Sequence, residues 1–252
     1  MTHPLPTDSR VALITGANKG IGLEIARGLG RHGITVLLGC RNEALGRDAA
    51  GHLTQEGLHA HALTLDVTDA ASAQDAAARI AQRFGRLDIL VNNAGIAARE
   101  EADAAREGKP LVDVEVMRRV YETNVFGPVA VTQAMLPLLR QAPAGRIVNV
   151  SSGLGSLTNM SDPSHPYAGL AVPAYASSKA ALNGVTAQLA KVLKDTPIKV
   201  NSACPGHCAT DLNRHSGPRT PAQGAVTPIR LALLPADGPT GGFFNDEGAL
   251  PW

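Results

Sequence analysis

The stretch RVALITGANKGIG, residues 10–22, decides how the rest of the chain is organised. Its apolar first half predicts a buried strand, and the amphipathic residues that follow predict a helix. Gly16, Gly20 and Gly22 lie between them, and because glycine lacks Cβ it allows a sharp turn and a close approach to a pyrophosphate. Amides at a helix N-terminus favour such an anion. The spacing is GxxxGxG, not GxGxxG, so a structural glycine turn also fits, but the strand–turn–helix context favours a nucleotide-phosphate site.

The same alternation of strand and helix continues to about residue 205. The predicted strands are Arg10–Thr15, Thr35–Leu38, Ala60–Leu65, Leu87–Asn92, Arg146–Val150 and Lys199–Ala203. The predicted helices are Gly20–His32, Glu43–Glu56, Ala70–Phe84, two within Val112–Gln141, and Ala174–Lys194. Repeated βα units predict an α/β fold, in which helices cover both faces of a parallel sheet. No linker or repeat divides the sequence, so residues 1–252 are expected to form a single domain.

Composition excludes several classes of protein. With 23 basic and 22 acidic residues among 252, nothing favours binding to nucleic acid or to an anionic membrane. Three cysteines without a CxxC motif argue against a disulfide framework and fit a reducing cytosol. No metal site is expected, because zinc usually needs four ligands at recognisable spacing. Since no signal-like segment or run of about 18 apolar residues occurs, we expect a soluble cytoplasmic protein.

The stretch AYASSKA, residues 174–180, carries a tyrosine and a lysine four positions apart. On a helix Tyr175 and Lys179 would share one face. An ammonium beside a phenol favours the phenolate, and at ~4 Å with an effective dielectric of ~20 it supplies on the order of 4 kcal/mol. That is about enough to bring a tyrosine pKa of ~10 to neutrality. We therefore predict a proton donor and acceptor that works near pH 7; the alternative is a surface tyrosine beside a solvated lysine.

The second predicted strand ends in Gly-Cys-Arg41-Asn, where proteins that prefer NAD carry an acidic residue. The first acid here is Glu43, in the next predicted helix. The planar guanidinium of Arg41 suits a 2′-phosphate, and Lys19 in the glycine turn adds a second positive charge. These residues predict NADP(H) as the cofactor, and the alternative is that both basic side chains are merely solvated.

Polar residues also follow the other predicted strands, and each has two interpretations. Asp66 would bond to an adenine amino group or cap the helix that begins after Asp69. Asn93, in NNAG, would hold chain ends or a ribose, or form a plain turn. Asn124 would mark a bent helix with a bound water, or be a satisfied structural residue. Ser151 and Ser152 would face a ligand at the sheet edge, or form a local turn.

The motifs TGANKGIG, NNAG, VNVSSG, YASSK and CPG, with Asn124 and Thr210 at matching positions, resemble the short-chain dehydrogenase/reductase family over essentially the whole chain. The ANKGIG turn, Arg41 and the tail LALLPADGPTGGFF resemble its carbonyl-reductase branch. The resemblance implies a single-domain, Rossmann-type, doubly wound parallel sheet. It also implies a cofactor half at about residues 8–150 and a substrate and catalytic half at about 151–252.

The resemblance further implies roles for individual residues. Tyr175 would protonate the alkoxide during reduction, and Lys179 would lower the pKa of Tyr175 and hold the nicotinamide ribose. Ser152 would hydrogen-bond to the substrate oxygen, and Asn124 would support a water relay to Lys179. Besides Tyr175 and Lys179, the implied NADP(H) contacts are Gly16, Asn18, Lys19, Gly20, Ile21 and Gly22 for the phosphates, Arg41 for the 2′-phosphate, Asp66 and Val67 for the adenine, Asn93, Ala94 and Gly95 for the ribose side, and Pro205, Gly206 and Thr210 beside the nicotinamide.

The 22 residues between Ser152 and Tyr175 depart from the family's minimal spacing and are rich in Gly, Pro and Ser, so a loop beside the pocket is expected. This loop leaves the oligomeric state open between monomer, dimer and tetramer. His165 and Tyr167 within it would contact substrate or pack the loop.

The sequence as a whole predicts an NADPH-dependent enzyme that reversibly reduces a small ketone or aldehyde to an alcohol. The alternatives are an NAD-dependent secondary-alcohol dehydrogenase and a dinucleotide-binding sensor without catalysis.

Overall fold

The computed structural model describes residues 10–98, 101 and 113–252. Their strands form one sheet in the order β3-β2-β1-β4-β5-β6-β7-β8, parallel throughout except for β8, which runs antiparallel to β7. The strands are β1 (Val11–Thr15), β2 (Thr35–Cys40), β3 (Ala60–Thr64), β4 (Ile89–Asn92), β5 (Arg146–Val150), β6 (Lys199–Ala203), β7 (Phe243–Asn245) and β8 (Gly248–Ala249). The strand order reverses between β1 and β4, and in parallel α/β sheets ligands bind at the carboxyl ends beside such a reversal.

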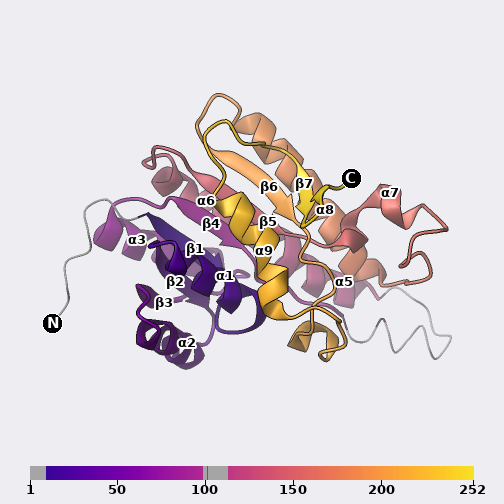
Figure 1. Ribbon diagram of the computed structural model, residues 1–252, viewed down its shortest axis with the longest axis horizontal. Helices are drawn as coiled ribbons and strands as arrows, with labels where there is room; N and C mark the ends of the chain where they lie inside the picture. The colour runs from indigo at the N-terminus through magenta and orange to yellow at the C-terminus, as the bar shows by residue number, and fades with distance from the viewer. Residues whose placement is uncertain (1–9, 99–100, 102–112) are drawn as a thin grey trace.

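Helices cover both faces of the sheet (Figure 1). Residues of α1, α2 and α9 pack in one core with the sheet, and residues of α3, α6 and α8 pack in the core on the opposite face. The α-helices are α1 (Gly20–Arg31), α2 (Glu43–Gln55), α3 (Ala70–Phe84), α5 (Val114–Tyr121), α6 (Gly127–Leu139), α7 (Leu157–Met160), α8 (Pro173–Val192) and α9 (Pro221–Ala232). A π-helical turn η1 (Glu122–Phe126) joins α5 to α6, and short 3-10 turns η2 (Gly153–Gly155) and η3 (Asp211–Asn213) follow β5 and β6.

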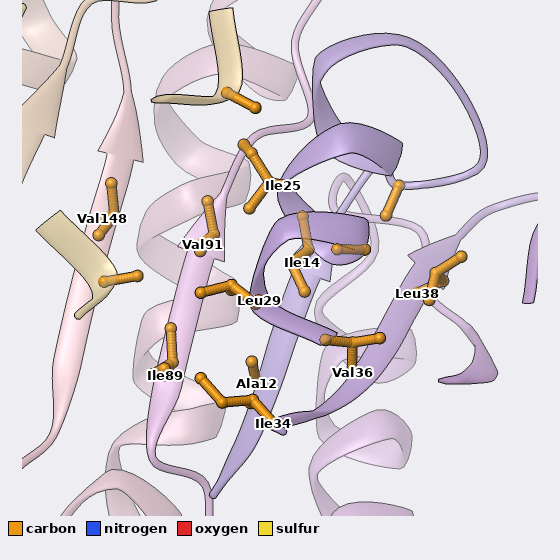
Figure 2. Close-up of a cluster of buried hydrophobic side chains, with 14 of the residues drawn as sticks. Ala12, Ile14, Ile25, Leu29, Ile34, Val36, Leu38, Ile89, Val91 and Val148 are labelled. Carbon is orange, nitrogen blue, oxygen red and sulfur yellow. The ribbon is translucent and has the colours of Figure 1, made fainter. Parts of the chain in front are cut away.

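The core explains why the strands are apolar at nearly every position. Figure 2 shows Ala12 and Ile14 of β1 directed toward Ile25 and Leu29 of α1. Leu13, between them, belongs to the core on the opposite face. Because successive side chains of a strand point to opposite faces, a sheet that is covered on both sides needs apolar residues at both odd and even positions of its strands. The predicted doubly covered parallel sheet is therefore confirmed.

The predicted boundaries are close for β1 to β6, and β5 and β6 match residue for residue. The sequence interpretation assigned no helix or strand after residue 205, so it missed α9 and the last two strands. Helix α9 contains Pro228, which lowers helix propensity. Its N-terminus nevertheless has a capping box between Thr220 and Gln223, a signal that can be found in the sequence. Within the described part of the chain, no helix combines the length and apolar character that crossing a membrane requires.

Candidate active site

The candidate site lies where β1, β4, β5 and β6 end, at the carboxyl edge of the sheet (Figure 1). Four segments that the sequence singled out meet there because parallel strands finish at the same edge. They are the glycine turn after β1, the Asn-Asn-Ala-Gly run after β4, the serine pair after β5 and the loop that begins with Pro205 after β6.

The glycine turn needs glycine for two different reasons. Gly16 and Gly20 have φ values of +64° and +59°, in the left-handed region that other residues rarely adopt. A Cβ on Gly22 would lie 2.6 Å from the carbonyl oxygen of Gly16 and would also collide with the Asn93 amide. Gly22 is therefore required for packing of α1 against the strand ends, whereas Gly16 and Gly20 shape the turn.

The N-terminus of α1 is left open by its own sequence. Lys19 precedes it without capping it, and its first turn has no acidic residue. In α2 and α3, by contrast, Asn42 accepts from the amide of Leu45 and Asp69 accepts from that of Ala71. Because the first amides of a helix lack partners within it, those of α1 are placed to bind an anion.

The remaining predicted phosphate residues lie in the same turn. Asn18 is half-buried, and Ile21 packs beside the core that α1 forms with the sheet. Lys19 forms an ion pair with Asp211, which belongs to η3 after β6, and both side chains are more than half exposed, at 66% and 51%. An exposed ion pair contributes at most about 1 kcal/mol. Its significance is therefore geometric, since it joins the glycine turn to the loop after β6.

Arg41 and Asp66 lie close to each other at the ends of β2 and β3. Burial raises the pKa of Asp66, but hydrogen bonds from Thr68 and the charge of Arg41 more than offset it, so the pKa is below its ordinary value. The Asp66 Oδ1 accepts from the Thr68 amide at 3.0 Å and from the Thr68 hydroxyl at 2.7 Å. The helix-capping alternative for Asp66 is wrong, because Asp69 caps α3. Val67 is buried in the core that includes α3.

The run after β4 is tied to the glycine turn. The Asn93 side-chain amide donates to the carbonyl oxygens of Thr15 at 2.9 Å and Gly16 at 3.3 Å. The backbone amides of Asn93 and Ala94 both donate to the Thr15 hydroxyl at 2.9 Å. Asn93 thus holds chain ends, the first of its predicted roles. A Cβ on Gly95 would lie within 3.5 Å of both Asn124 Oδ1 and Lys179 Nζ, so Gly95 brings this run next to the catalytic candidates.

Asn124 lies in the π-helical turn η1 and is fully buried. Its Oδ1 accepts from the Ile96 amide at 2.9 Å, and its Nδ2 donates to the Ile96 carbonyl at 2.9 Å and to Ser178 Oγ at 3.0 Å. The bent backbone that the sequence indicated is present, and the side chain is satisfied by protein groups. Asn124 therefore connects the chain after β4 to α8, the helix that carries Tyr175 and Lys179.

Tyr175 and Lys179 share one face of α8, as predicted, with Lys179 Nζ 5.8 Å from the centre of the Tyr175 ring. Lys179 is only 4% exposed, and its Nζ donates to the Val150 carbonyl at 2.9 Å. Burial lowers the pKa of Lys179 to about 8. Burial of the phenol raises the pKa of Tyr175 to about 12, outweighing the opposite effect of a hydrogen bond with Ser152.

These values correct one sequence prediction. Lys179 was expected to make the Tyr175 phenol acidic by placing a positive charge beside it. In the structure, desolvation of the hydroxyl dominates, since removing a phenol from water disfavours its charged form, and the pKa of Tyr175 rises. Desolvation also lowers the pKa of Lys179, because it disfavours the charged ammonium. At neutral pH the phenol is protonated and suited to give a proton.

The two serines after β5 have different surroundings. Ser151 is buried, and its hydroxyl donates to the Lys179 carbonyl oxygen at 3.4 Å, which is a structural contact. Ser152 is only half-buried, accepts from the Leu154 amide at 3.2 Å and hydrogen-bonds with Tyr175. Of the pair, the structure brings Ser152 to the tyrosine hydroxyl.

The loop after β6 lies over the glycine turn. The Thr210 methyl group is 3.7 Å from the position of a Cβ on Gly20, and Gly206 has a φ of +72°. Pro205 is buried, and its carbonyl accepts a hydrogen bond from the Cys208 thiol. The segments that were expected beside the nicotinamide and the phosphates thus meet at one place.

An aromatic cluster joins this loop to the segment between Ser152 and Tyr175. The Tyr167 ring lies 5.6 Å from the His165 ring and 6.4 Å, edge-on, from the His207 ring. His165 and Tyr167 therefore pack the loop, one of their two predicted roles. Sequence reasoning weighed Cys204 and His207 only as metal ligands and set that interpretation aside. It did not place His207 in this aromatic cluster, nor Cys204 beside Tyr175, although the buried Cys204 thiol lies close enough to raise the pKa of Tyr175.

The opposite, amino edge of the sheet has an open pocket of about 410 Å³, lined partly by Arg10, Arg86, Asp88 and Arg146. Buried Asp88 accepts from the Val11 amide at 2.8 Å and from Arg86 at 3.2 Å. The buried guanidinium of Arg146 donates to carbonyl oxygens of Leu234 and Pro235 and of two residues in neighbouring loops. These charged groups are engaged in holding chain segments together.

Known proteins resemble this chain over nearly its whole length. A family model described as short chain dehydrogenase matches residues 10–220. (-)-Isopiperitenone reductase of Mentha piperita is 36% identical, over 96% of this chain and 98% of that protein. Carbonyl reductase (NADPH) 3 of Rattus norvegicus is also 36% identical, over 97% and 99%. The crystal structure of NADPH-bound carbonyl reductase from chicken fatty liver superposes with a TM-score of 0.83 at 28% identity, over 97% and 99%.

Proposed function

The chain belongs to the short-chain dehydrogenase family of oxidoreductases, and we propose that it reduces a ketone or aldehyde to an alcohol with NADPH, in a reversible reaction. Two relatives are named as reductases, and the chicken carbonyl reductase has NADPH bound. We assign the cofactor to the half of the chain at about residues 8–150, and the substrate to the half at about 151–252, in a cytoplasmic enzyme.

One observation carries the proposal: the Tyr175 phenol meets Ser152 and buried Lys179 at the carboxyl edge of the sheet. Reduction of a carbonyl group places negative charge on its oxygen, and Tyr175 gives that oxygen a proton. Ser152 hydrogen-bonds to the same oxygen and stabilises the developing charge. A positioned general acid contributes roughly 10²- to 10⁴-fold in rate. Because the pKa of Tyr175 is raised, the phenol carries its proton at neutral pH and has one to give.

A nicotinamide dinucleotide fits the residues at this edge and would supply the hydride when bound. The uncapped N-terminus of α1 and the turn shaped by Gly16 and Gly20 would hold its pyrophosphate. Lys179 would hold the nicotinamide ribose beside Gly95, while Asn124 keeps α8 in register with the chain after β4. Asp66 would take the adenine, since its carboxylate is not used to cap α3.

The preference for NADPH over NADH rests on Arg41. No acid ends β2, and the carboxylate of Glu43, the first acid after it, pairs with Arg47 within α2. Substitution of Arg41→Asp would replace a favourable charge with one that repels a 2′-phosphate. We expect kcat/KM for NADPH to fall on the order of 10- to 100-fold, as loss of a charge-assisted hydrogen bond implies, with little change for NADH. An unchanged preference would favour the NAD-dependent alternative and remove the role of Arg41.

The proposal is tested by following NADPH absorbance with a panel of simple aldehydes and ketones, with cofactor binding measured separately by calorimetry. We expect absorbance to fall only when a carbonyl compound is present. Tight NADPH binding without turnover of any carbonyl compound, or of any alcohol with NADP⁺, would contradict the enzymatic proposal and favour a sensor.

A further inference from the structure

Glu101 is a buried acidic residue that contacts the start of α8, the helix that carries Tyr175. It is only 4% exposed, and it lies in the chain that follows β4. Its Oε1 accepts from the Ala174 amide at 2.6 Å, and its Oε2 accepts from the Tyr175 amide at 3.4 Å. The carboxylate thus contacts the backbone of the proposed proton donor itself, from a position more than 70 residues earlier in the sequence.

The first turn of α8 needs such a partner. Val172 precedes the helix, and its side chain makes no capping hydrogen bond. The first turn of α8 contains no acidic residue. Pro173 has no amide hydrogen, so the next two amides, those of Ala174 and Tyr175, are the first that require acceptors. Glu101 supplies both oxygens. Its negative charge also lies at the positive end of the helix dipole, where an anion is stabilised.

The apolar surroundings of Glu101 keep its carboxylate on these two amides. Its amide donates to the carbonyl of Ala98 at 3.4 Å, and Ala98 belongs to an apolar cluster with Val116, Val120 and Ala174. Burial of a carboxylate beside apolar groups is unfavourable unless it is hydrogen-bonded. The Glu101 side chain is consequently held to the two amides at the N-terminus of α8, and in turn it holds them.

From this geometry we propose that Glu101 is a positioning residue for Tyr175: its carboxylate fixes the first turn of α8 and, with it, the place of the phenol relative to Ser152. This inference rests on the proposed function of Tyr175. Sub-ångström placement matters for proton transfer, and a misplacement of about 1 Å can lower a rate on the order of 100-fold. The proposed pyrophosphate site lies after β1 and at the start of α1, away from the turn that Glu101 holds. Loss of Glu101 is therefore expected to change kcat far more than NADPH affinity.

The test compares Glu101→Ala, which removes both acceptor oxygens, with Glu101→Gln, which keeps one. Asp88→Ala is the matched control, because Asp88 is also a buried carboxylate that accepts a backbone amide, but at the amino edge of the sheet. We expect Glu101→Ala to lower kcat on the order of 10- to 100-fold with NADPH Kd within about twofold. Glu101→Gln should recover most of that loss, and Asp88→Ala should lower stability while keeping kcat within about twofold of wild type.

Hydrogen exchange gives a second readout that needs no turnover. The amides of Ala174 and Tyr175 should exchange faster in Glu101→Ala than in wild type and in Asp88→Ala. The inference is overturned if Glu101→Ala keeps the wild-type kcat, if Glu101→Gln is as slow as Glu101→Ala, or if Asp88→Ala lowers kcat equally. Failure of the proposed function is recognised separately, by a Tyr175→Phe variant that retains wild-type turnover while the exchange result still shows the contact of Glu101 with α8.

Discussion

Buried ionisable groups lie at both edges of the sheet, but their partners differ. At the amino edge, Arg146 donates to several carbonyl oxygens and Asp88 accepts from an amide and from Arg86. At the carboxyl edge, Lys179 donates to the Val150 carbonyl, and Tyr175 hydrogen-bonds with Ser152. Burial shifts the pKa values of both groups at the carboxyl edge toward their neutral forms.

This difference distinguishes groups that hold the fold together from groups that can exchange a proton. A guanidinium stays charged at any working pH, and a network that satisfies it holds segments in place. A lysine with a pKa of about 8 beside a protonated phenol can gain or lose a proton near neutral pH. The same sheet thus carries a hydrogen-bonded guanidinium network at one edge and, at the other, the groups that we propose carry the chemistry.

The largest expected effect follows from removing the phenol oxygen. Tyr175→Phe keeps the ring and its packing but eliminates the proton donor, so kcat should fall about 10³-fold, equivalent to about 4 kcal/mol. NADPH Kd, measured by calorimetry, should stay within about twofold of wild type. If the loss appeared in Kd and not in kcat, Tyr175 would belong to the binding site alone. The carboxyl edge would then have no proton donor at this position.

The pKa of Lys179 predicts how stability depends on pH. In the unfolded chain the lysine keeps its proton to about pH 10.5, whereas in the folded chain it releases the proton at about pH 8. Between these values the unfolded state binds more protons, so the contribution to stability rises with pH. Relative to Lys179→Met, the wild-type free energy of unfolding should increase by at most about 3 kcal/mol from pH 7 to pH 10. Urea unfolding at both pH values measures it, and a constant difference would contradict the lowered pKa.

Asp88→Ala probes the amino edge. It leaves the Val11 amide without its buried acceptor and Arg86 without its partner, so the free energy of unfolding should fall by about 2 kcal/mol. The measurement is urea unfolding at pH 7, alongside kcat. We expect kcat within about twofold of wild type; a large loss of activity would mean that the two edges are coupled.

The smallest effect is expected from the exposed ion pair between Lys19 and Asp211. Asp211→Asn removes the charge from one partner, and since both side chains are largely exposed, stability should change by less than about 1 kcal/mol. The informative quantity is the KM for NADPH, measured at low and high salt. We expect a change of a few-fold that salt reduces, and no change at low salt would show that this contact does not affect cofactor entry.

Much of the fold follows from local pattern. Strands such as VALIT and the glycines of the first turn can be predicted from the sequence around them. Burial on both faces requires a continuous apolar run, and a positive φ angle favours glycine at that position. The convergence of the segments that follow β1, β4, β5 and β6 also follows, since strand ends of a parallel sheet share an edge. Helix α9 was missed because Pro228 weakens its local signal.

Two features of the site depend on distant contacts and are not visible in the sequence. The contact of Glu101 with α8 joins residues 73 positions apart, and nothing in its own neighbourhood indicates the partner. The direction of the Tyr175 pKa depends on how deeply the phenol is desolvated, a property of the packed structure. From spacing alone, only the attraction between Tyr175 and Lys179 was evident, whereas burial is the largest influence on the pKa of Tyr175 in the structure.

The central claim is that Tyr175 is a protonated acid at neutral pH, and a spectroscopic titration tests it most directly. The phenolate absorbance of wild type is measured against Tyr175→Phe, which leaves Tyr121 and Tyr167 unchanged. Because the pKa of Tyr175 is about 12, the difference spectrum should contain no phenolate signal from pH 6 to pH 10. A phenolate that forms between pH 6 and pH 8 would contradict the account.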